Sequence, residues 1–274
     1  MTENPWSGVF AATLCPFLPD HAIDRDGLQA YTAYLAAVPG LCGLVCNGHT
    51  GEVMGLRPRE RAEVVHLMKE AAGDMRVISG ICCEGSLEAI DHVQAAKEAG
   101  ADAVLLMPPH HWLRFGRPSV TAVGYFEDVA ASGDVPIIVH QYPDWTKATY
   151  TLDEMLALTE IEQVVAIKMG TRNMSRLGHE HRVLKEHAPD IPLLSCHDEF
   201  LPSSHVHGGE ATLQEHGHLH ALVGFRGGFT EPVDAFVQTV HDLLRGIGPH
   251  VIPRQHGLHQ IHDCLLYTSP SPRD

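Results

Sequence analysis

Lys168 is the residue of this chain whose type and position most favour covalent chemistry. It ends the apolar run 163–168, which has the composition of a buried strand. A lysine at the mouth of a barrel can be desolvated, lose its proton and attack a ketone to form a Schiff base. The structural alternative is a solvated lysine at a strand end, and the surrounding elements must decide between the two.

A short turn supplies a second group with possible chemistry. In the sequence Gly48-His49-Thr50-Gly51-Glu52, the two glycines let the backbone approach a ligand closely. Exposed N–H groups together with the Thr50 hydroxyl can hold a carboxylate. The turn alone is equally compatible with a plain cap for the next helix.

His140 and Tyr142 are the third group. Two residues apart on an extended segment, they face the same side, which would be inward near Lys168. An imidazole and a phenol there can move protons, although His140 by itself is compatible with a structural role. A lysine, an anion-binding turn and a proton relay together suit Schiff-base chemistry on an α-keto acid, with carbon–carbon cleavage, condensation or dehydration as possible outcomes.

The elements that must position these groups alternate between strand and helix. Eight apolar runs are predicted as buried parallel strands: 8–15, 42–47, 76–80, 102–107, 135–140, 163–168, 191–195 and 220–225. Amphipathic segments between or after them are predicted as helices: 27–38, 58–73, 86–100, 119–132, 151–159, 175–187 and 231–247. Eight such units favour an α/β fold of the (β/α)8 TIM-barrel type, with catalytic groups at the carboxyl ends of the strands. No GxGxxG motif follows the first predicted strand and the sequence has no GxxxxGKS or GxxxxGKT motif, which counts against a dinucleotide-binding or P-loop fold.

One region departs from this pattern. Residues 201–219 are longer and more polar than a strand–helix unit needs. We interpret them as an inserted loop or a damaged reading frame between the seventh and eighth strands.

Composition limits the possible partners. The chain has 274 residues, 44% of them hydrophobic, and a formal net charge of -15, so we expect neither nucleic acid nor an anionic membrane as a partner. The N-terminal residues lack the features of a secretory signal, and the seven cysteines form no CxxC pair, which predicts a cytoplasmic protein with reduced thiols. The 21 histidines favour a compositional bias in a surface loop over a metal site.

The last eleven residues, CLLYTSPSPRD, have no helical or strand period and look like the translation of a sequencing adapter. We therefore predict one barrel domain over residues 1–263, with its C-terminal helices truncated, and a non-native tail over 264–274.

The chain resembles the dihydrodipicolinate synthase / N-acetylneuraminate lyase family of Schiff-base pyruvate aldolases over most of residues 8–263. The turn 48–52 is similar to the family's GTTGE or GSTGE turn, and Val165-Ala166-Ile167-Lys168 is similar to the strand that carries its Schiff-base lysine. The start of the chain at 12–17 and the segments around Gly80, Pro108 and Pro143 match further family segments, with Cys82 in place of a second glycine.

This resemblance implies a cofactor-independent lyase, an aldolase or hydro-lyase that acts on pyruvate or a sugar-derived 2-keto acid. It implies that Lys168 forms the imine and that Thr50, with the Gly51 backbone, holds the substrate carboxylate. Gly48 and Glu52 belong to the same substrate-binding turn. It also implies a homodimer or homotetramer.

Several relay positions depart from the family pattern. His140 stands where the family has its catalytic tyrosine, His49 stands at the first hydroxyl residue of the turn, and His110 lies near the position of a second tyrosine. Trp145 replaces an arginine that binds the second substrate, which argues against lysine-biosynthetic synthase activity. We expect His49, His110 and His140 to form a substitute relay, since imidazole titrates near neutrality, with Tyr142 as an alternative phenol.

Two other functions remain open. A metal-dependent barrel hydrolase would use the many histidines with Asp198, although the first strand lacks the HxH pair that such a site normally has. A barrel that binds a keto acid without turning it over is the other alternative, because the relay is altered. We expect no metal and no cofactor for the Schiff-base lyase.

Overall fold

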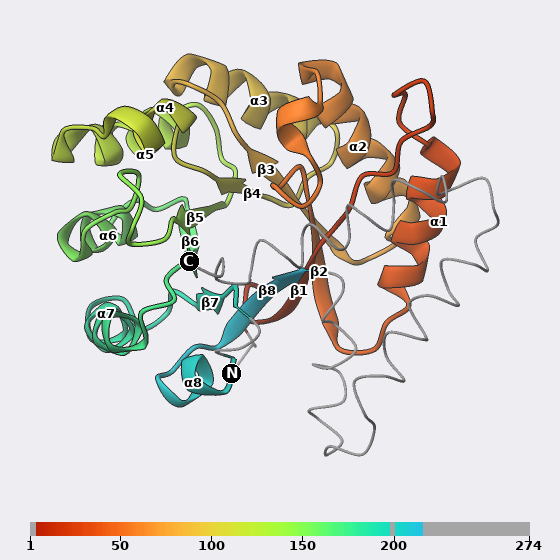
Figure 1. Cartoon of the computed structure of the whole chain (residues 1–274). Helices are drawn as coiled ribbons and strands as arrows, with labels where there is room; N and C mark the ends of the chain where they lie inside the picture. The colour runs from red at the N-terminus through yellow and green to blue at the C-terminus, as the bar shows by residue number, and fades with distance from the viewer. Residues whose placement is uncertain (1–3, 198–200, 216–274) are drawn as a thin grey trace, which may run out of the picture.

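The computed structural model describes residues 4–197 and 201–215, which form a closed barrel of parallel strands with helices outside it (Figure 1). The strands follow one another around the barrel in chain order, and the last pairs with the first. They are β1 (Gly8–Ala12), β2 (Leu41–Cys46), β3 (Arg76–Ile81), β4 (Ala103–Leu106), β5 (Ile137–Gln141), β6 (Val164–Met169), β7 (Leu193–Ser195) and β8 (Ala211–Glu215). The predicted TIM-type barrel is confirmed.

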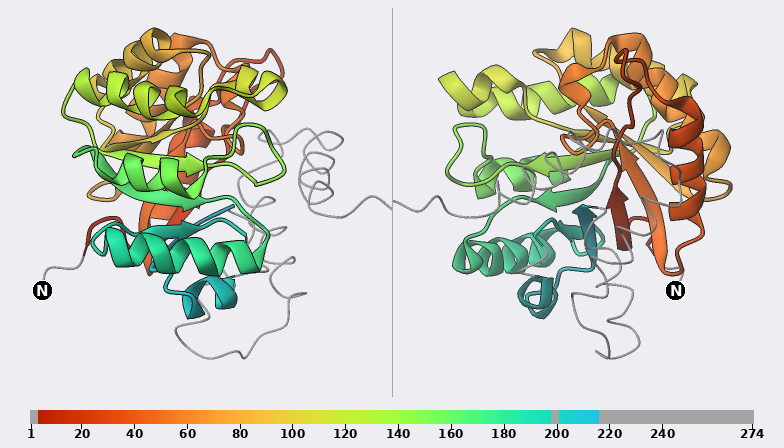
Figure 2. Two further views of the ribbon diagram at one scale, coloured as in Figure 1. Left: turned by 90° about the vertical axis from the view of Figure 1, so that its left-hand side faces the viewer. Right: turned by 45° about the vertical axis from the view of Figure 1, so that its right-hand side comes forward.

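Helices cover the outer side of the strands, as two further views show (Figure 2). They are α1 (Arg25–Ala36), α2 (Pro58–Ala71), α3 (Ser86–Glu98), α4 (His110–Phe115), α5 (Ser119–Ala131), α6 (Leu152–Thr159), α7 (Met174–His187) and α8 (Leu201–Val206), with a short 3-10 helix η1 (Val53–Gly55). Side chains of Asp24, Thr151 and Asn173 accept hydrogen bonds from first-turn amides and so fix three of the helix starts. Six of the predicted helices match observed ones, while α4, α8 and η1 were not predicted.

The position of the eighth strand is a correction. The sequence predicted it at 220–225, which lies outside the described residues, whereas the strand that closes the barrel between β7 and β1 is β8. Ala211 and Leu213 of β8 are buried, and the Thr212 hydroxyl donates to the Ser195 carbonyl oxygen at 3.0 Å. The described part of the expected insert therefore contains α8 and the last strand, β8. This strand has only five residues and follows a segment rich in histidine and glycine, so the sequence pattern did not indicate it.

The predicted helix 231–247 and the predicted non-native tail lie outside the described residues. The six described cysteines are all free thiols. No helix in the described ranges has both the length and the apolar composition needed to cross a membrane.

A buried ion pair fixes the long connection between β5 and α6. The side chains of Arg117 and Glu154 are only 5% and 7% exposed, and two nitrogens of the guanidinium reach the two carboxylate oxygens. Arg117 also donates to the Thr149 carbonyl oxygen at 3.0 Å and lies 5.2 Å from the ring centres of Trp112 and Tyr150. Such a bidentate, stacked arrangement is specific to arginine and holds the end of this loop against α5.

His181 of α7 is a buried titratable group away from the strand ends. Its side chain is inaccessible, and a Cβ atom at Gly209 would lie 3.4 Å from its ring. Burial lowers the pKa of His181 to about 4; a backbone contact with His207 opposes this shift, and the charges of His207 and Lys185 add to it. The folded protein therefore holds a neutral imidazole here at neutral pH.

We expect this histidine to weaken the fold in acid. An unfolded histidine has a pKa of about 6.5, so the stability that neutral His181 contributes is complete above that pH and is lost as the pH falls toward 4. His181→Leu should therefore reduce the loss of unfolding free energy between pH 7.5 and pH 5 by about 2 kcal/mol. Urea unfolding at the two pH values measures this loss. His179→Leu, at an exposed position of the same helix, is the control, and equal acid losses in all three proteins would contradict the expectation.

Candidate active site

The pairing of β5 with β6 places His140 directly beside Lys168. The two residues are partners in the parallel register, so their side chains leave the sheet on the same face. His140 is buried with 6% of its surface exposed, and Lys168 is half-buried. The predicted lysine is thus held beside an imidazole at the carboxyl end of the barrel strands, where catalytic groups of this fold lie.

A close backbone contact fixes this pair of strand ends. The Gly170 amide donates to the Gln141 carbonyl oxygen at 3.0 Å, and a Cβ atom at Gly170 would lie 2.4 Å from the same oxygen. Only glycine fits this approach without moving the backbone. The Gln141 amide group in turn bonds both the N–H and the carbonyl oxygen of Tyr150 at 2.8 Å, which ties the strand end to the following loop.

The side chains that we expect to form a relay lie together as a group of four rings, which we call the histidine cluster: His49, His110, His140 and Tyr142. The ring centres of His49 lie 6.0 Å from those of His110 and His140 and 5.7 Å from that of Tyr142. Tyr142 Oη and His49 Nε2 are hydrogen-bonded at 2.9 Å, and the rings of His140 and Tyr142 lie 4.7 Å apart. Three strand ends, those of β2, β4 and β5, therefore meet in one polar group next to Lys168.

The electrostatics favour the neutral forms of three members of the cluster, His49, His140 and Tyr142. Burial lowers the pKa of His140 well below its usual value, and the charges of Lys168 and His49 add to this effect. His49 keeps an exposed surface, yet its neighbours displace water from the ring, and this desolvation, followed by the charges of Lys168 and His110, lowers the pKa of His49. Burial raises the pKa of Tyr142, with smaller contributions from Cys82 and Tyr150. At neutral pH the cluster can both donate and accept protons.

Two ring nitrogens of the cluster are available to a ligand. His110 Nε2 and His140 Nδ1 are buried, and neither has a hydrogen-bond partner within the described chain. A buried polar atom without a partner costs free energy, which a bound polar group would recover. These nitrogens therefore suit a ligand whose polar groups can form hydrogen bonds with them.

The turn between β2 and η1 is closed by its own backbone. The Glu52 amide donates to the His49 carbonyl oxygen at 3.0 Å, and the Val53 amide donates to that of Gly48 at 3.2 Å. Within the described residues, the amides of Thr50 and Gly51 make no backbone hydrogen bond. Two adjacent N–H groups beside a half-buried Thr50 are compatible with carboxylate binding.

Asn47, which the sequence analysis did not single out, sets the start of this turn. It has a positive φ of 52°, which asparagine tolerates better than most residues. Its Nδ2 donates to the Arg61 carbonyl oxygen at 2.9 Å and to Ser79 Oγ at 3.0 Å. The signal in the sequence was an asparagine followed by a glycine at a strand end, a pair that often adopts left-handed backbone.

The other predicted binding residues lie farther out. Glu52 is exposed and adopts left-handed backbone with a φ of 54°. Trp145 is 79% exposed, and none of the ring contacts described for the histidine cluster involves it. Lys168, His49, His110, His140 and Tyr142 are thus brought together, whereas Trp145 lies on the surface of the loop after β5.

The geometry gives no support to the alternative metal-dependent hydrolase. In residues 4–197 and 201–215, no group of three or more histidine, cysteine, aspartate or glutamate side chains is arranged to hold a metal ion. Asp198, one of the ligands considered, lies outside those ranges. His205 is exposed, and its Nδ1 lies 3.2 Å from the Gly209 carbonyl oxygen.

We expect the turn to depend on Gly80 of β3. A Cβ atom there would lie 2.1 Å from the Asn47 carbonyl oxygen, so Gly80→Ala must displace the turn or the strand. Overpacking of this kind typically costs about 1–3 kcal/mol of unfolding free energy, measurable by urea titration. Gly55→Ala, where a Cβ atom meets nothing within 4 Å, is the control. Equal unfolding free energies for the two variants would contradict the expectation, because they would show that the backbone around Asn47 can move away from the added Cβ atom without loss of stability.

Comparison with known proteins shows which sequences and folds this chain is similar to. A model of the dihydrodipicolinate synthetase family matches residues 5–221. A protein named 4-hydroxy-tetrahydrodipicolinate synthase from Methanothrix thermoacetophila is 33% identical over 172 residues, which cover 62% of this chain and 56% of that protein. The match thus spans little more than half of that relative's length. A protein of the same name from Natronomonas pharaonis is 29% identical over 99% of this chain and 94% of its own.

Solved structures share the fold at lower identity. A prophage protein of the dihydrodipicolinic acid synthase family from E. coli K12, solved in complex with pyruvate, has a TM-score of 0.72 and 21% identity, covering 88% of this chain and 82% of its own. N-acetylneuraminate lyase from Mycoplasma synoviae has a TM-score of 0.70 and 22% identity, with the same coverage. These two likenesses support the barrel fold and, at such identities, nothing finer.

Proposed function

The chain belongs to the dihydrodipicolinate synthetase family, and we propose that it is a Schiff-base lyase in which Lys168 forms an imine with a 2-keto acid. The observation that carries the proposal is the pairing of Lys168 with His140 at the strand ends, next to the histidine cluster. This family consists of Schiff-base, pyruvate-dependent aldolases and synthases. The fold, the lysine and the turn all agree with that chemistry.

The proposed first steps follow from the groups present. The Lys168 amine adds to the keto carbon; its nitrogen gives one proton to the cluster and the former carbonyl oxygen receives one from it, which leaves a neutral carbinolamine. A second proton from the cluster lets the hydroxyl group leave as water and gives the iminium, which withdraws electrons from the neighbouring carbon. Removal of a proton from that carbon, or cleavage of its bond to the next carbon, then yields an enamine. For a condensation, the same groups would act in the reverse order, with the enamine attacking the second substrate.

The histidine cluster is proposed to move these protons. His140 is the ring nearest Lys168 in the strand register, and the bond from Tyr142 Oη to His49 Nε2 connects two further members. Because neutral imidazole has one donor and one acceptor nitrogen, it can take over the role of a hydroxyl group in a relay. The low pKa values of His49 and His140 keep both rings neutral at physiological pH.

The turn is proposed to bind the substrate carboxylate through Thr50 and the Gly51 amide, with Gly48 giving room for its approach. The substrate is pyruvate or a sugar-derived 2-keto acid. The pyruvate in the prophage protein is compatible with this choice, but it belongs to that protein. Trp145 is exposed and lacks the charge needed to bind a second carboxylate, which favours a substrate other than that of the named synthases.

The proposal predicts a covalent adduct at one lysine. With pyruvate and borohydride, the protein should gain one reduced pyruvate unit, and peptide mass spectrometry should find it on Lys168. Lys168→Arg should lose the adduct because a guanidinium does not form the imine, while Lys97→Arg, at an exposed position, should keep it. No adduct in folded protein, or an adduct spread over surface lysines, would contradict the assignment of Lys168.

A second prediction separates the relay from imine formation. His140→Phe should slow the exchange of pyruvate methyl protons with deuterium by roughly 10²-fold, because it removes an acid–base group, yet leave the borohydride adduct. Proton NMR in deuterated buffer measures the exchange. His111→Phe is the matched control, since His111 is exposed and pairs with Glu84 at 2.6 Å outside the cluster. Equal exchange rates for the wild type and His140→Phe would remove His140 from the mechanism, and an adduct without exchange in the wild type would favour the non-catalytic binding barrel.

A further inference from the structure

One side chain of α2 holds the far end of the segment that contains the proposed carboxylate-binding turn. Arg61 Nε donates to the Leu56 carbonyl oxygen at 3.2 Å, where that segment ends. At its start, Asn47 Nδ2 donates to the Arg61 backbone carbonyl oxygen at 2.9 Å. Segment 47–56 is therefore fixed at both ends by a single residue of a regular helix.

Arg61 also reaches the neighbouring strand. Its Nη1 donates to the Cys82 carbonyl oxygen at 2.7 Å, directly after β3. Cys82 lies at the edge of the proposed site, since it contributes to the raised pKa of Tyr142 and its sulfur is 3.3 Å from that of Met54. The guanidinium thus joins the turn after β2 to the end of β3.

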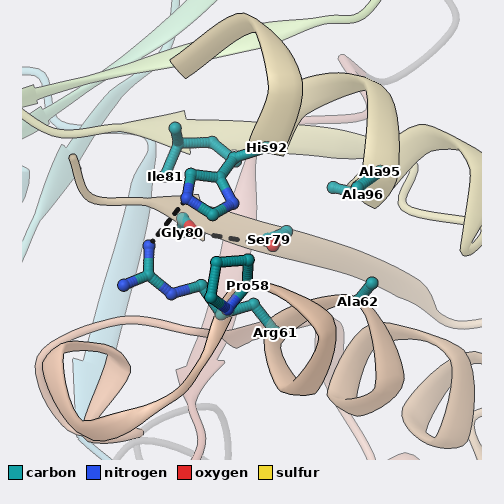
Figure 3. Close-up of a pocket in the computed structure, with 9 residues that line it drawn as sticks. All are labelled: Pro58, Arg61, Ala62, Ser79, Gly80, Ile81, His92, Ala95 and Ala96. Carbon is teal, nitrogen blue, oxygen red and sulfur yellow. Dashed lines mark hydrogen bonds between the residues drawn. The ribbon is translucent and has the colours of Figure 1, made fainter. Parts of the chain in front are cut away.

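The surroundings of Arg61 restrict the guanidinium to this orientation. It points across the end of β3 toward His92 of α3, in a small cavity that Ser79 and Gly80 also line (Figure 3). Arg61 Nη1 and His92 Nε2 are 3.2 Å apart, and because a guanidinium only donates, His92 Nε2 must accept. Glu88 lies 3.7 Å from the same nitrogen of His92, which is itself buried.

We propose that Arg61 is a positioning residue that orients the turn amides toward the substrate carboxylate without contacting the substrate. The inference rests on the proposed function of that turn. The two internal backbone bonds of the turn do not connect it to β3; the bond from Asn47 Nδ2 to Ser79 Oγ ties its start to that strand, and the Arg61 side chain ties its far end to the Cys82 carbonyl oxygen. A carboxylate held by N–H groups needs their directions fixed, and a shift of the turn weakens binding while Lys168 stays in place.

The test compares Arg61→Met and Arg61→Lys with the wild type. Arg61→Met keeps the apolar stem and loses the donors to Leu56 and Cys82, whereas lysine retains a donor without the planar fork. Arg59→Met, at an exposed position of the same helix, is the matched control. Two quantities are measured: hydrogen–deuterium exchange of the peptide covering 47–56, and the pyruvate concentration that gives half-maximal borohydride adduct.

Arg61→Met should exchange faster in 47–56 with β4 and β5 unchanged, and should need about 10-fold more pyruvate while reaching the same maximal adduct. Arg61→Lys should fall between it and the wild type, and Arg59→Met should match the wild type. A general loss of stability would instead speed exchange in all peptides. Wild-type exchange and wild-type half-saturation in the folded Arg61 variants would overturn the proposal, and if Arg61→Met does not fold, Arg61→Lys decides.

The two proposals fail in different ways. If the wild type forms no adduct with pyruvate, the proposed Schiff-base function fails for that substrate, and the exchange of 47–56 still decides whether Arg61 holds the turn. If the wild type forms the adduct and Arg61→Met changes neither quantity, the function stands and the role of Arg61 fails.

Discussion

The parallel register between β5 and β6 is the constraint on which the site depends. A shift of one residue would turn His140 or Lys168 to the other face of the sheet, toward the helices. The strand ends are held in that register by the amide of Gly170, which bonds the Gln141 carbonyl oxygen at a distance that no larger residue permits. Gln141 then bonds the backbone of Tyr150, so the loop after β5 is fixed by the same contact.

Burial gives the cluster its chemical character. Imidazoles in water are partly protonated near neutral pH, but a dry site beside a lysine favours the neutral ring. His140 shows this most clearly, because it is almost fully buried and Lys168 is its neighbour in the register. In the proposed mechanism a neutral ring can accept the proton that the Lys168 nitrogen loses on addition to the keto carbon, which a charged ring could not. The same effect acts on His181, which is buried outside the site.

The sequence predicted the parts of the molecule that follow from local pattern. Lys168 could be placed because an apolar run ending in a cation is visible in a single segment, and the pair His140 and Tyr142 because strand geometry alone sets their common face. The prediction failed at β8, a five-residue strand among histidines and glycines, whose assignment depends on pairing with β7 and β1. Arg61 was also missed, since its contacts with Cys82 and His92 appear only when the chain is folded and nothing in its own helix distinguishes it from Arg59.

Replacing hydroxyl groups by imidazoles changes what the barrel around them must provide. A hydroxyl can rotate to find a partner, whereas an imidazole has two nitrogens at fixed positions on a rigid ring. A relay of imidazoles therefore requires backbone segments held to within a fraction of an ångström, here by Gly80, Gly170 and the contacts of Asn47. His110 Nε2 and His140 Nδ1 are buried without partners in the described chain, so a bound polar group could satisfy them. Under the proposed function, the rigidity that the imidazoles need would thus also prepare the site for a substrate rich in oxygen.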